Sequence, residues 1–376
     1  MPKTVAVLLL SALDNDSRVQ KEIGILNKLG FFVMVMSVNS RNPDADSHIV
    51  LRHVARRIIV PGLMSFVLYT RYANAAIRWL MAADIIHCND LNTLPVGVML
   101  KLLSFGRIKV VYDAHEFESN QIPNQSRFSI RMLQMVEGAL IRFADAVITV
   151  SNGIAEEYAR LYNIKKPALV LNCPPYKEVG KNNIFRKTLG ITYEQTIFLY
   201  QGGLSKGRGI EILLETFAGL PAANVIVFMG YGPLEGQIKE YALAHENIYF
   251  QPAVAPDVLL NYTSSADFGI LFYENTCKNH DYCSPNKMFE YIMAGIPVIV
   301  SNLHEMRRVV EQNAIGVVAQ ENTVQGLQEA IRCATKLDKT VVRENLGKIK
   351  RLYCWEEQEK VLHKVYADLC VPDYKC

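Results

Sequence analysis

The stretch from Tyr282 to Ser301, YCSPNKMFEYIMAGIPVIVS, constrains the fold of this 376-residue chain more than any other. Ser284 and Pro285 predict a helix start, because a hydroxyl can cap free amides and a proline suits the first helical turn. Gly295 predicts the end of that helix, where a left-handed residue is favoured. Val298 to Val300 then reads as a short buried strand. A loop, a helix and a buried strand in this order are typical of an α/β protein.

Two charged residues interrupt the apolar pattern of this helix. Lys287 and Glu290 stand three residues apart, close to the positive end of the predicted helix. Free amides and an ammonium group at a helix start form an anion site, and a carboxylate one turn later can bind sugar hydroxyls. The alternative is a Lys–Glu pair on a solvated face. These two residues alone leave both interpretations open.

Length and charge narrow the class of protein. A chain of 376 residues is too long for one ordinary core, so two domains are expected. The net charge of +3 is too small to indicate nucleic acid. Eight scattered cysteines without a CxxC pair favour reduced thiols in a cytoplasm. Cys277, His280 and Cys283 come nearest to metal-ligand spacing, but no fourth ligand is evident and no metal site is predicted.

Membrane crossing is not expected from the sequence. The apolar run near residues 5–10 is far shorter than the core of a signal peptide, and no run approaches the roughly 20 apolar residues of a membrane span. The region 52–80 is different, because five arginines alternate there with large apolar residues: Arg52, Arg56, Arg57, Arg71 and Arg78. Such a stretch fits peripheral binding to an anionic membrane surface on the cytoplasmic side. The alternative is a pair of docking helices whose arginines reach solvent along their apolar stems.

The first half begins with a strand–helix–strand pattern. A buried strand is predicted at residues 5–10, a helix ending at Gly30, and a second strand at Phe31 to Val38. The crossover makes the sheet parallel. Arg18 opens the helix at the carboxyl end of the first strand, where ligands of such sheets bind, and is therefore a candidate site residue.

A second candidate group follows a later strand. The strand at Lys109 to Tyr112 runs directly into Asp113, His115 and Glu116. Titratable residues at the carboxyl edge of a strand are where catalytic groups concentrate in open α/β sheets. The alternative is that Asp113 caps a helix and His115 is solvated.

The stretch from Pro167 to Asn183 predicts a strand at Ala168 to Leu171 and then a linker. The linker separates this half from a second α/β series, so a cleft is expected at their junction. In the second half a strand at Phe198 to Tyr200 is followed by QGGLSKGRG. Its glycines allow close backbone approach to a ligand. Arg208 and Gly209 stand where a Walker loop needs Lys and Ser or Thr, so a diphosphate cradle is favoured over an NTP-hydrolysing loop. The alternative is a flexible glycine turn.

These segments together resemble a known family. YQGGLSKGRGIEILLETF, VFMGYGP, YTSSADFGI and SPNKMFEYIMAGIPVIVS occur, over roughly residues 196–320, in the order found in the donor half of GT-B fold glycosyltransferases, most like the retaining glycosyltransferase family 4. The first half adds VVYDAHE, which matches the family pattern more loosely. The resemblance implies two Rossmann-like α/β domains facing a central cleft. They would be residues 1–173 plus about 355–376, and residues 180–354, with the last helix crossing back to the first domain.

The resemblance also implies site roles. Arg208 and Lys287 would hold the donor diphosphate, and Glu290 would bind the ribose. His115 would lie near the reacting sugar. The remaining donor-side candidates are Gly203, Lys206, Gly230, Gly232, Tyr282, Ser284, Pro285 and Asn286. The acceptor-side candidates are Arg18, Asp113 and Glu116.

Two positions depart from the family pattern. Gly203 stands where many members carry an arginine, so Lys206 or Lys287 would supply the second charge. Tyr282 occupies the position of the first of the family's paired glutamates, which contacts the transferred sugar. Asp281 or the Tyr282 hydroxyl is a candidate substitute.

The expected reaction is transfer from a nucleotide-diphosphate sugar to a glycan or lipid-linked saccharide, in cell-surface polysaccharide or glycoconjugate synthesis. No DxD metal motif is apparent in the donor half of the sequence, so we expect Arg208 and Lys287 to replace a divalent ion at the departing diphosphate, without an essential cofactor. The resemblance implies retention of configuration, by departure and attack on one face of the sugar. The alternatives are a nucleotide-sugar epimerase on the same scaffold and a non-catalytic partner subunit that keeps the fold.

Overall fold

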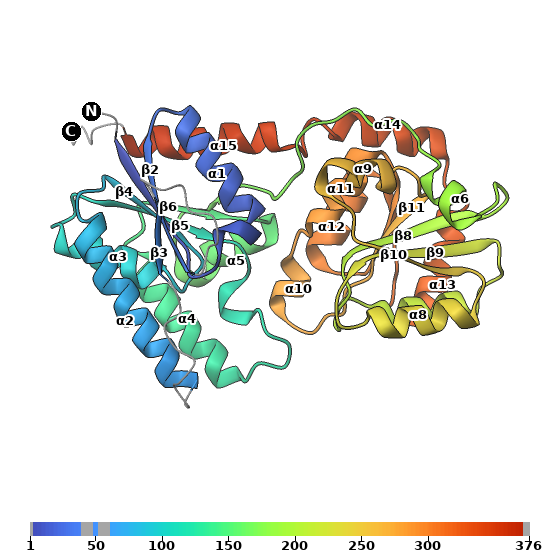
Figure 1. Cartoon of the computed structure of the whole chain (residues 1–376), viewed down its shortest axis with the longest axis horizontal. Coiled ribbons are helices and arrows are strands. Elements are labelled where there is room, and N and C mark those ends of the chain that lie inside the picture. The colour runs from blue at the N-terminus through green and yellow to red at the C-terminus, as the bar shows by residue number, and fades with distance from the viewer. Residues whose placement is uncertain (1–2, 39–47, 52–60, 371–376) are drawn as a thin grey trace. The chain divides into compact units, whose positions relative to one another are not determined.

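The computed structural model describes residues 3–38, 48–51 and 61–370. The chain divides into two compact units. Unit 1 comprises Met1–Gln121, Gln125–Val170 and Glu359–Cys376, and unit 2 comprises Ile122–Asn124 and Leu171–Gln358. Each unit is an α/β fold around one parallel sheet, as the sequence predicts (Figure 1).

Unit 1 is built on a seven-stranded sheet with the order β3-β2-β1-β4-β5-β6-β7, in which the paired strands are all parallel. Its strands are β1 Thr4–Leu8, β2 Phe32–Val38, β3 His48–Leu51, β4 Ile85–Asn89, β5 Lys109–Ala114, β6 Ala146–Thr149 and β7 Ala168–Leu169. The strand order reverses beside β1. The carboxyl ends of β1, β4 and β5 therefore meet at one edge of the sheet, where ligands of such folds bind.

The helices of unit 1 begin where the sequence supplies caps. The Asp16 carboxylate accepts a hydrogen bond from the amide of Val19, and Ser126 and Ser151 cap two later helices in the same way. The helices are α1 Ser17–Lys28, α2 Pro61–Leu80, α3 Leu94–Leu103, α4 Arg127–Ile141 and α5 Asn152–Tyr162, with short 3-10 helices η1 Leu13–Asn15 and η2 Glu118–Asn120. The last helix, α15 Trp355–Cys370, returns to this unit and buries Tyr366 in its core.

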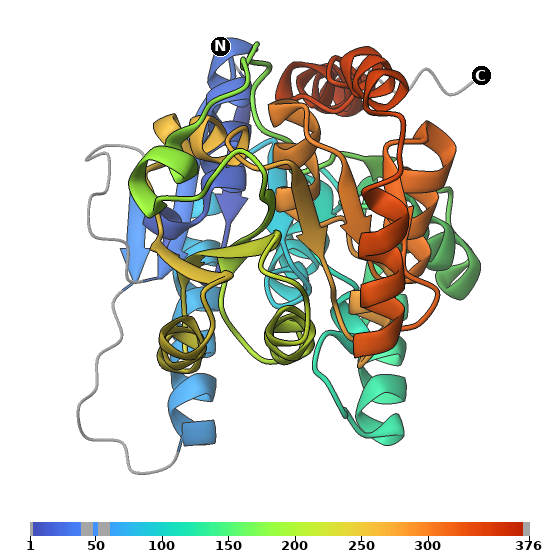
Figure 2. The same cartoon turned by 90° about the vertical axis from the view of Figure 1, so that its right-hand side faces the viewer.

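Unit 2 repeats the same plan with six strands in the order β10-β9-β8-β11-β12-β13. The strands are β8 Thr196–Gly203, β9 Asn224–Tyr231, β10 Ile248–Pro252, β11 Phe268–Leu271, β12 Val298–Val300 and β13 Gly316–Val318. Helices cover both faces of the sheet (Figures 1 and 2). They are α6 Ile184–Leu189, α7 Ile210–Ala218, α8 Glu235–Ala244, α9 Pro256–Thr263, α10 Lys278–Tyr282, α11 Asn286–Ala294, α12 His304–Asn313, α13 Val324–Ala334 and α14 Lys339–Ile349.

Close backbone packing explains two glycines of unit 2. A Cβ on Gly230 would lie 1.9 Å from the carbonyl oxygen of Gly202, where β8 and β9 end side by side. A Cβ on Gly209 would lie 1.8 Å from the carbonyl oxygen of Phe272, and Gly209 has a φ of 71°. Close packing therefore fixes the backbone at Gly209, where the loop after β8 ends, and at Gly230 beside the start of that loop.

The stretch from Tyr282 to Ser301 folds largely as predicted. It forms α11 and β12, and Gly295 ends α11 with a φ of 73°. The predicted cap is wrong, because α11 begins at Asn286 and no side chain caps it. The Ser284 hydroxyl is buried and lies 3.5 Å from a carboxylate oxygen of Glu305 instead.

The arginine-rich region 52–80 is only partly described. Residues 52–60 lie outside the described residues, and residues 61–80 form the helix α2, so the expected pair of helices stays a prediction. Within the described part of the chain, no helix is both long enough and apolar enough to span a bilayer.

Candidate active site

Two cations of unit 2 meet at one aromatic ring. Arg208 follows β8 in the glycine loop, and its guanidinium carbon lies 4.6 Å from the centre of the Tyr273 ring. Arg208 also donates a hydrogen bond to the Tyr273 hydroxyl. The ammonium nitrogen of Lys287, at the start of α11, lies 5.5 Å from the centre of the same ring. The fold thus brings together the two residues that the sequence predicts as a diphosphate clamp.

Lys287 is a buried cation. Its side chain is 7% exposed, and Nζ lies 3.8 Å from the centre of the Tyr200 ring, the distance of a strong cation–π contact. Burial, together with the neighbouring charge of Arg208, holds the pKa of Lys287 well below its ordinary value. These facts exclude the solvated Lys–Glu pair considered from sequence. A buried ammonium beside a second cation favours an anionic ligand.

Glu290 is held by a residue that sequence reasoning missed. The amide of Gln201, at the end of β8, donates a hydrogen bond to the Glu290 carboxylate. The other end of that amide accepts a hydrogen bond of 2.8 Å from Thr263. Gln201 is 2% exposed, and Thr263 fixes which way its amide points. The only sequence signal was position, because Gln201 directly precedes the glycine pair but carries no charge.

The glycines near the two cations differ in how closely they are packed. Gly202 has a φ of 110°, and a Cβ there would approach the Lys287 side chain to 3.4 Å. Gly203 has open space where a Cβ would point, and Lys206 is exposed. Gly232 has a φ of 154° and packs against the backbone of Leu204. Gly230 and Gly232 therefore shape the loop through backbone packing.

The residues before α11 are engaged with α10 and α12. Tyr282 lies edge-on to the His304 ring at 5.4 Å between centres, and its hydroxyl accepts a hydrogen bond of 3.3 Å from Lys278. The Asp281 carboxylate accepts a hydrogen bond of 2.9 Å from the amide of His304 at the start of α12. Of the residues predicted at this helix start, Pro285 precedes the first turn and Asn286 is exposed.

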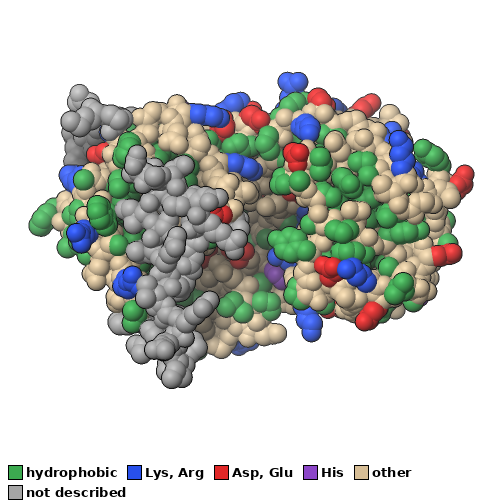
Figure 3. Space-filling view, viewed as in Figure 1, with side chains coloured by type: hydrophobic (Ala, Val, Ile, Leu, Met, Phe, Trp, Pro, Cys, Tyr) green, Lys and Arg blue, Asp and Glu red, His purple; other side chains and the backbone are tan. Residues whose placement is uncertain are grey.

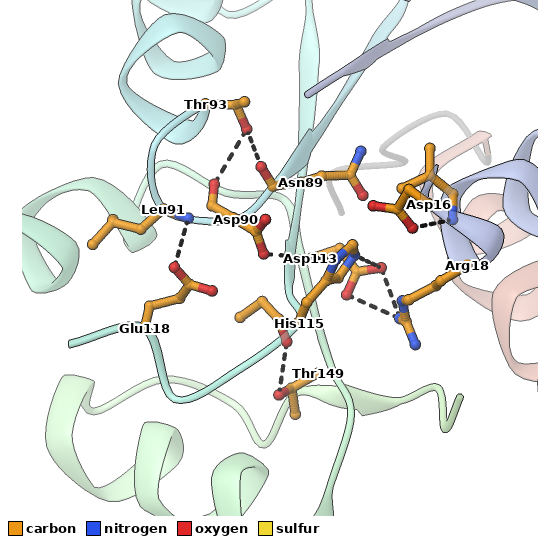
Figure 4. A network of polar contacts seen from close by, with 12 residues as sticks. Asp16, Arg18, Asn89, Asp90, Leu91, Thr93, Asp113, His115, Glu118 and Thr149 are labelled. Atoms are coloured by element: carbon orange, nitrogen blue, oxygen red, sulfur yellow. Dashed lines mark hydrogen bonds and ion pairs between the residues drawn. The ribbon is translucent and has the colours of Figure 1, made fainter. Parts of the chain in front are cut away.

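Unit 1 holds a separate buried network at the carboxyl edge of its sheet. Arg18 is 3% exposed and binds Asp113 through its Nη2, at 3.0 and 2.8 Å from the two carboxylate oxygens. Its Nη1 donates to the carbonyl of Val170 at 2.7 Å. Figure 4 shows Arg18 and His115 approaching the Asp113 carboxylate from different segments. Arg18 is thus a buried support for Asp113, and Asp113 does not cap a helix.

His115 is a positively charged group in this network. Its Nε2 lies 3.6 Å from Asp113 and its Nδ1 lies 3.6 Å from Asp90. Burial opposes the charged ring, but the Asp113 carboxylate outweighs it and raises the pKa of His115 to about 9. The side chain is 16% exposed, so His115 can still reach a ligand. Glu116, the third residue of the predicted group, is exposed.

A nearby cluster has the geometry of a metal site but already holds a cation. Glu22, His87 and Asp113 offer ligand atoms within 4.8 Å of one another. The Arg18 guanidinium fills that position, with Nε 3.0 Å from Glu22 and Nη2 2.8 Å from Asp113. His87 is fixed from the other side by a contact of 2.6 Å between its Nδ1 and the Tyr366 hydroxyl of α15. The cluster therefore braces His115 and ties α15 into unit 1.

Both halves of the chain match sequence models of glycosyltransferase families. The model named Glycosyltransferase Family 4 matches residues 24–173, and the model named Glucosyltransferase 3-like, C-terminal domain, matches residues 222–354. TuaC of Bacillus subtilis, assigned provisionally to teichuronic acid biosynthesis as a glycosyltransferase, is 22% identical over 72% of this chain and 68% of its own length. The chain spans 61% and 68% of two curated relatives that it matches.

Solved structures share the whole fold. The sucrose-phosphate synthase of Thermosynechococcus elongatus superposes with a TM-score of 0.77 at 19% identity, covering 98% of this chain and 99% of that one. HepE of Anabaena, in complex with UDP, superposes with a TM-score of 0.70 at 16% identity, covering 97% and 100%. The expected two-domain α/β fold is thereby confirmed.

Proposed function

We propose that this chain, a member of the GT-B glycosyltransferases, transfers a sugar from a nucleotide-diphosphate sugar to a glycan or a lipid-linked saccharide. The observation that carries the proposal is the meeting of Arg208 and Lys287 at the Tyr273 ring, next to a glycine loop in which Gly203 has no neighbour close to its Cβ position. A pair of cations so arranged suits a diphosphate. The complex of HepE with UDP supports the same class of donor.

The chemistry of the leaving group follows from these cations. Breaking the bond between the sugar and the diphosphate moves negative charge onto the diphosphate oxygens. Arg208 and Lys287 are already in place and partly shielded from water, so they stabilise that charge without reorganisation. In this proposal they act where other enzymes use a divalent ion. Glu290, oriented by Gln201, binds the ribose hydroxyls of the nucleotide.

In this proposal, His115 acts on the transferred sugar and the departing diphosphate acts on the acceptor. Charged His115 donates a hydrogen bond to the reacting sugar rather than acting as a base, since its pKa is about 9. Retention of configuration is part of the proposal, with the departing diphosphate taking the acceptor proton. A glycan or lipid-linked acceptor agrees with the provisional role of TuaC in teichuronic acid synthesis.

A direct assay separates this proposal from its rivals. The purified chain is incubated with a panel of nucleotide sugars, with and without saccharide acceptors, in the presence of EDTA, and products are followed by NMR. The proposal expects acceptor-dependent transfer, or slow donor hydrolysis, with unchanged anomeric configuration. Epimerisation of the donor without an acceptor would identify an epimerase. Donor binding without any turnover across the acceptor panel would contradict the catalytic role.

A further inference from the structure

Helix α4 in unit 1 carries an exposed stripe that is both apolar and basic. The large apolar side chains on it are Phe128, Met132, Met135 and Val136, exposed by 75%, 44%, 69% and 44%, with Phe143 just beyond the helix at 41%. The exposed arginines on the same face are Arg127, Arg131 and Arg142. These eight residues, which we name the α4 stripe, recur every three or four positions and so share one side of the helix.

The buried side of α4 keeps the α4 stripe exposed to solvent. Glu137 is fully buried, and its carboxylate accepts hydrogen bonds of 2.7 Å from Tyr112 and 2.6 Å from Tyr158 and from Tyr162. Three tyrosines on one carboxylate fix the rotation of α4 about its axis. The α4 stripe cannot turn inward without breaking this network, so its exposure is a built feature of unit 1.

The apolar surface continues at the end of α3. Leu102, Leu103 and Phe105 are exposed by 57%, 49% and 100%. Lys101, on the last turn of α3, donates a hydrogen bond of 2.9 Å to the carbonyl of Phe143 and so ties the two helix ends together. A cluster of large exposed apolar side chains of this kind marks an interaction surface.

The charges of the α4 stripe distinguish between two kinds of partner, a second copy of the chain and an anionic lipid surface. Between residues 127 and 143 the only acidic residue is Glu137, which is buried. A second copy of the chain docked on this face would set the same three arginines against one another. An anionic lipid surface instead offers phosphate groups to the arginines and an acyl boundary to Phe128 and Met135. Elsewhere the balance differs, since Figure 3 shows positive and negative side chains interspersed over unit 2.

We infer that the α4 stripe is a docking surface for an anionic membrane, with α4 lying in the plane of the headgroups. The inference deepens the proposed function by giving a lipid-linked acceptor a surface on which to meet the enzyme. The membrane contact expected at region 52–80 stays a separate prediction.

Vesicle binding of the full chain tests the inference without donor or acceptor. Binding to vesicles containing phosphatidylglycerol is expected at low salt, with much weaker binding to phosphatidylcholine alone and at 0.5 M salt. Replacing both Arg127 and Arg131 by Gln should lower the partition coefficient of the protein between vesicles and water about 25-fold, since each arginine contributes about fivefold. A matched pair in unit 2, Lys336→Gln with Lys348→Gln, should leave it unchanged.

A second pair of variants tests insertion rather than charge. Phe128→Ser with Met135→Ser should lower the partition, whereas Leu243→Ser, a change at a 91% exposed leucine of α8, should not. A melting temperature and a far-UV circular dichroism spectrum close to those of the wild type, both measured without ligand, report that each variant is folded. Absence of vesicle binding at low salt would overturn the inference, as would full binding by both stripe variants. Self-association that the stripe variants abolish would assign the surface to a second copy instead. Failed turnover with intact vesicle binding would contradict only the proposed function.

Discussion

Gln201 donates a hydrogen bond to Glu290, linking the end of β8 to the first turns of α11. The two residues are 89 positions apart in the chain, and the contact sets the direction in which the carboxylate points. Tyr291, the next residue of α11, adds a second link, because its hydroxyl accepts from the amide of Gln201 at 3.1 Å and donates to the carbonyl of Leu199 at 3.0 Å. The proposed donor site therefore depends on the sheet as well as on the helix.

Replacing Gln201 by Leu should weaken donor binding about tenfold or more. Removing a hydrogen bond to a charged group costs about 1.5 to 3 kcal/mol, and the ribose anchor would lose its orientation. Titration calorimetry with a nucleotide sugar measures the change. Gln251→Leu, on β10 of the same sheet, is the matched control and should bind as the wild type does. Equal affinity of the Gln201 variant would remove Gln201 from the site.

Replacing Arg208 by Ala should lower kcat about a hundredfold with a smaller change in donor affinity. Loss of one preorganised donor to a developing negative charge typically costs about 3 kcal/mol. Steady-state kinetics on the wild type, Arg208→Ala and Arg208→Lys measure it, and the lysine variant should recover part of the rate. Lys239→Ala, an exposed cation on α8, serves as the control. An unchanged kcat in Arg208→Ala would show that Arg208 does not act on the leaving group.

Binding of a nucleotide sugar should take up protons through Lys287. Burial and Arg208 depress the pKa of Lys287 in the free protein, and a bound diphosphate restores it. A lysine with a depressed pKa is increasingly neutral as pH rises through that pKa, so proton uptake grows and affinity falls with rising pH. Calorimetry in buffers of different ionisation enthalpy measures the uptake. Lys287→Met should abolish it, and a buffer-independent enthalpy in the wild type would argue against a depressed pKa.

The stability of unit 1 should depend on pH through His115. Its pKa is raised from 6.5 to about 9, so the stabilisation is fully present below pH 6.5 and is lost as pH rises through 9. At most about 3 kcal/mol is involved, from the conversion of a pKa shift into free energy. Urea unfolding of the wild type and His115→Gln between pH 6 and 10 measures the difference, which should shrink over this range. A constant difference would mean that His115 is not paired with Asp113 as described.

Much of the fold was accessible from local patterns. The alternation of strands and helices in each half is specified by features that act over a few residues. These features are short buried strands, glycines that end helices, such as Gly295, and the glycine loop before α7. Arg208 and Lys287 were also accessible as candidates, since a charge beside a glycine turn or a helix start has a physical reason to face a ligand, and both side chains lie near the Tyr273 ring. Ser284 was misread because a buried carboxylate from α12 competes for its hydroxyl.

Residues whose role depends on distant neighbours could not be read from sequence. Arg18 looks like a ligand contact until Asp113, 95 positions away, is seen to bind it in the core. Tyr273 and Gln201 carry no charge, and only the folded sheet shows that they hold Arg208 and Glu290. His87 and Tyr366 meet only because α15 returns to unit 1.

The central claim is that Arg208, Lys287 and Glu290 form a donor site, and a thermal-shift screen of UDP-, GDP-, ADP- and dTDP-sugars tests it most directly. A ligand that binds the folded chain raises its melting temperature, and at 100 times Kd the gain is about 2.7 kcal/mol. We expect at least one nucleotide sugar to raise the Tm of the wild type and of Lys239→Ala. The same compound should give no shift with the double variant Arg208→Ala and Lys287→Met. No shift with any compound, or an undiminished shift in the double variant, would contradict the claim.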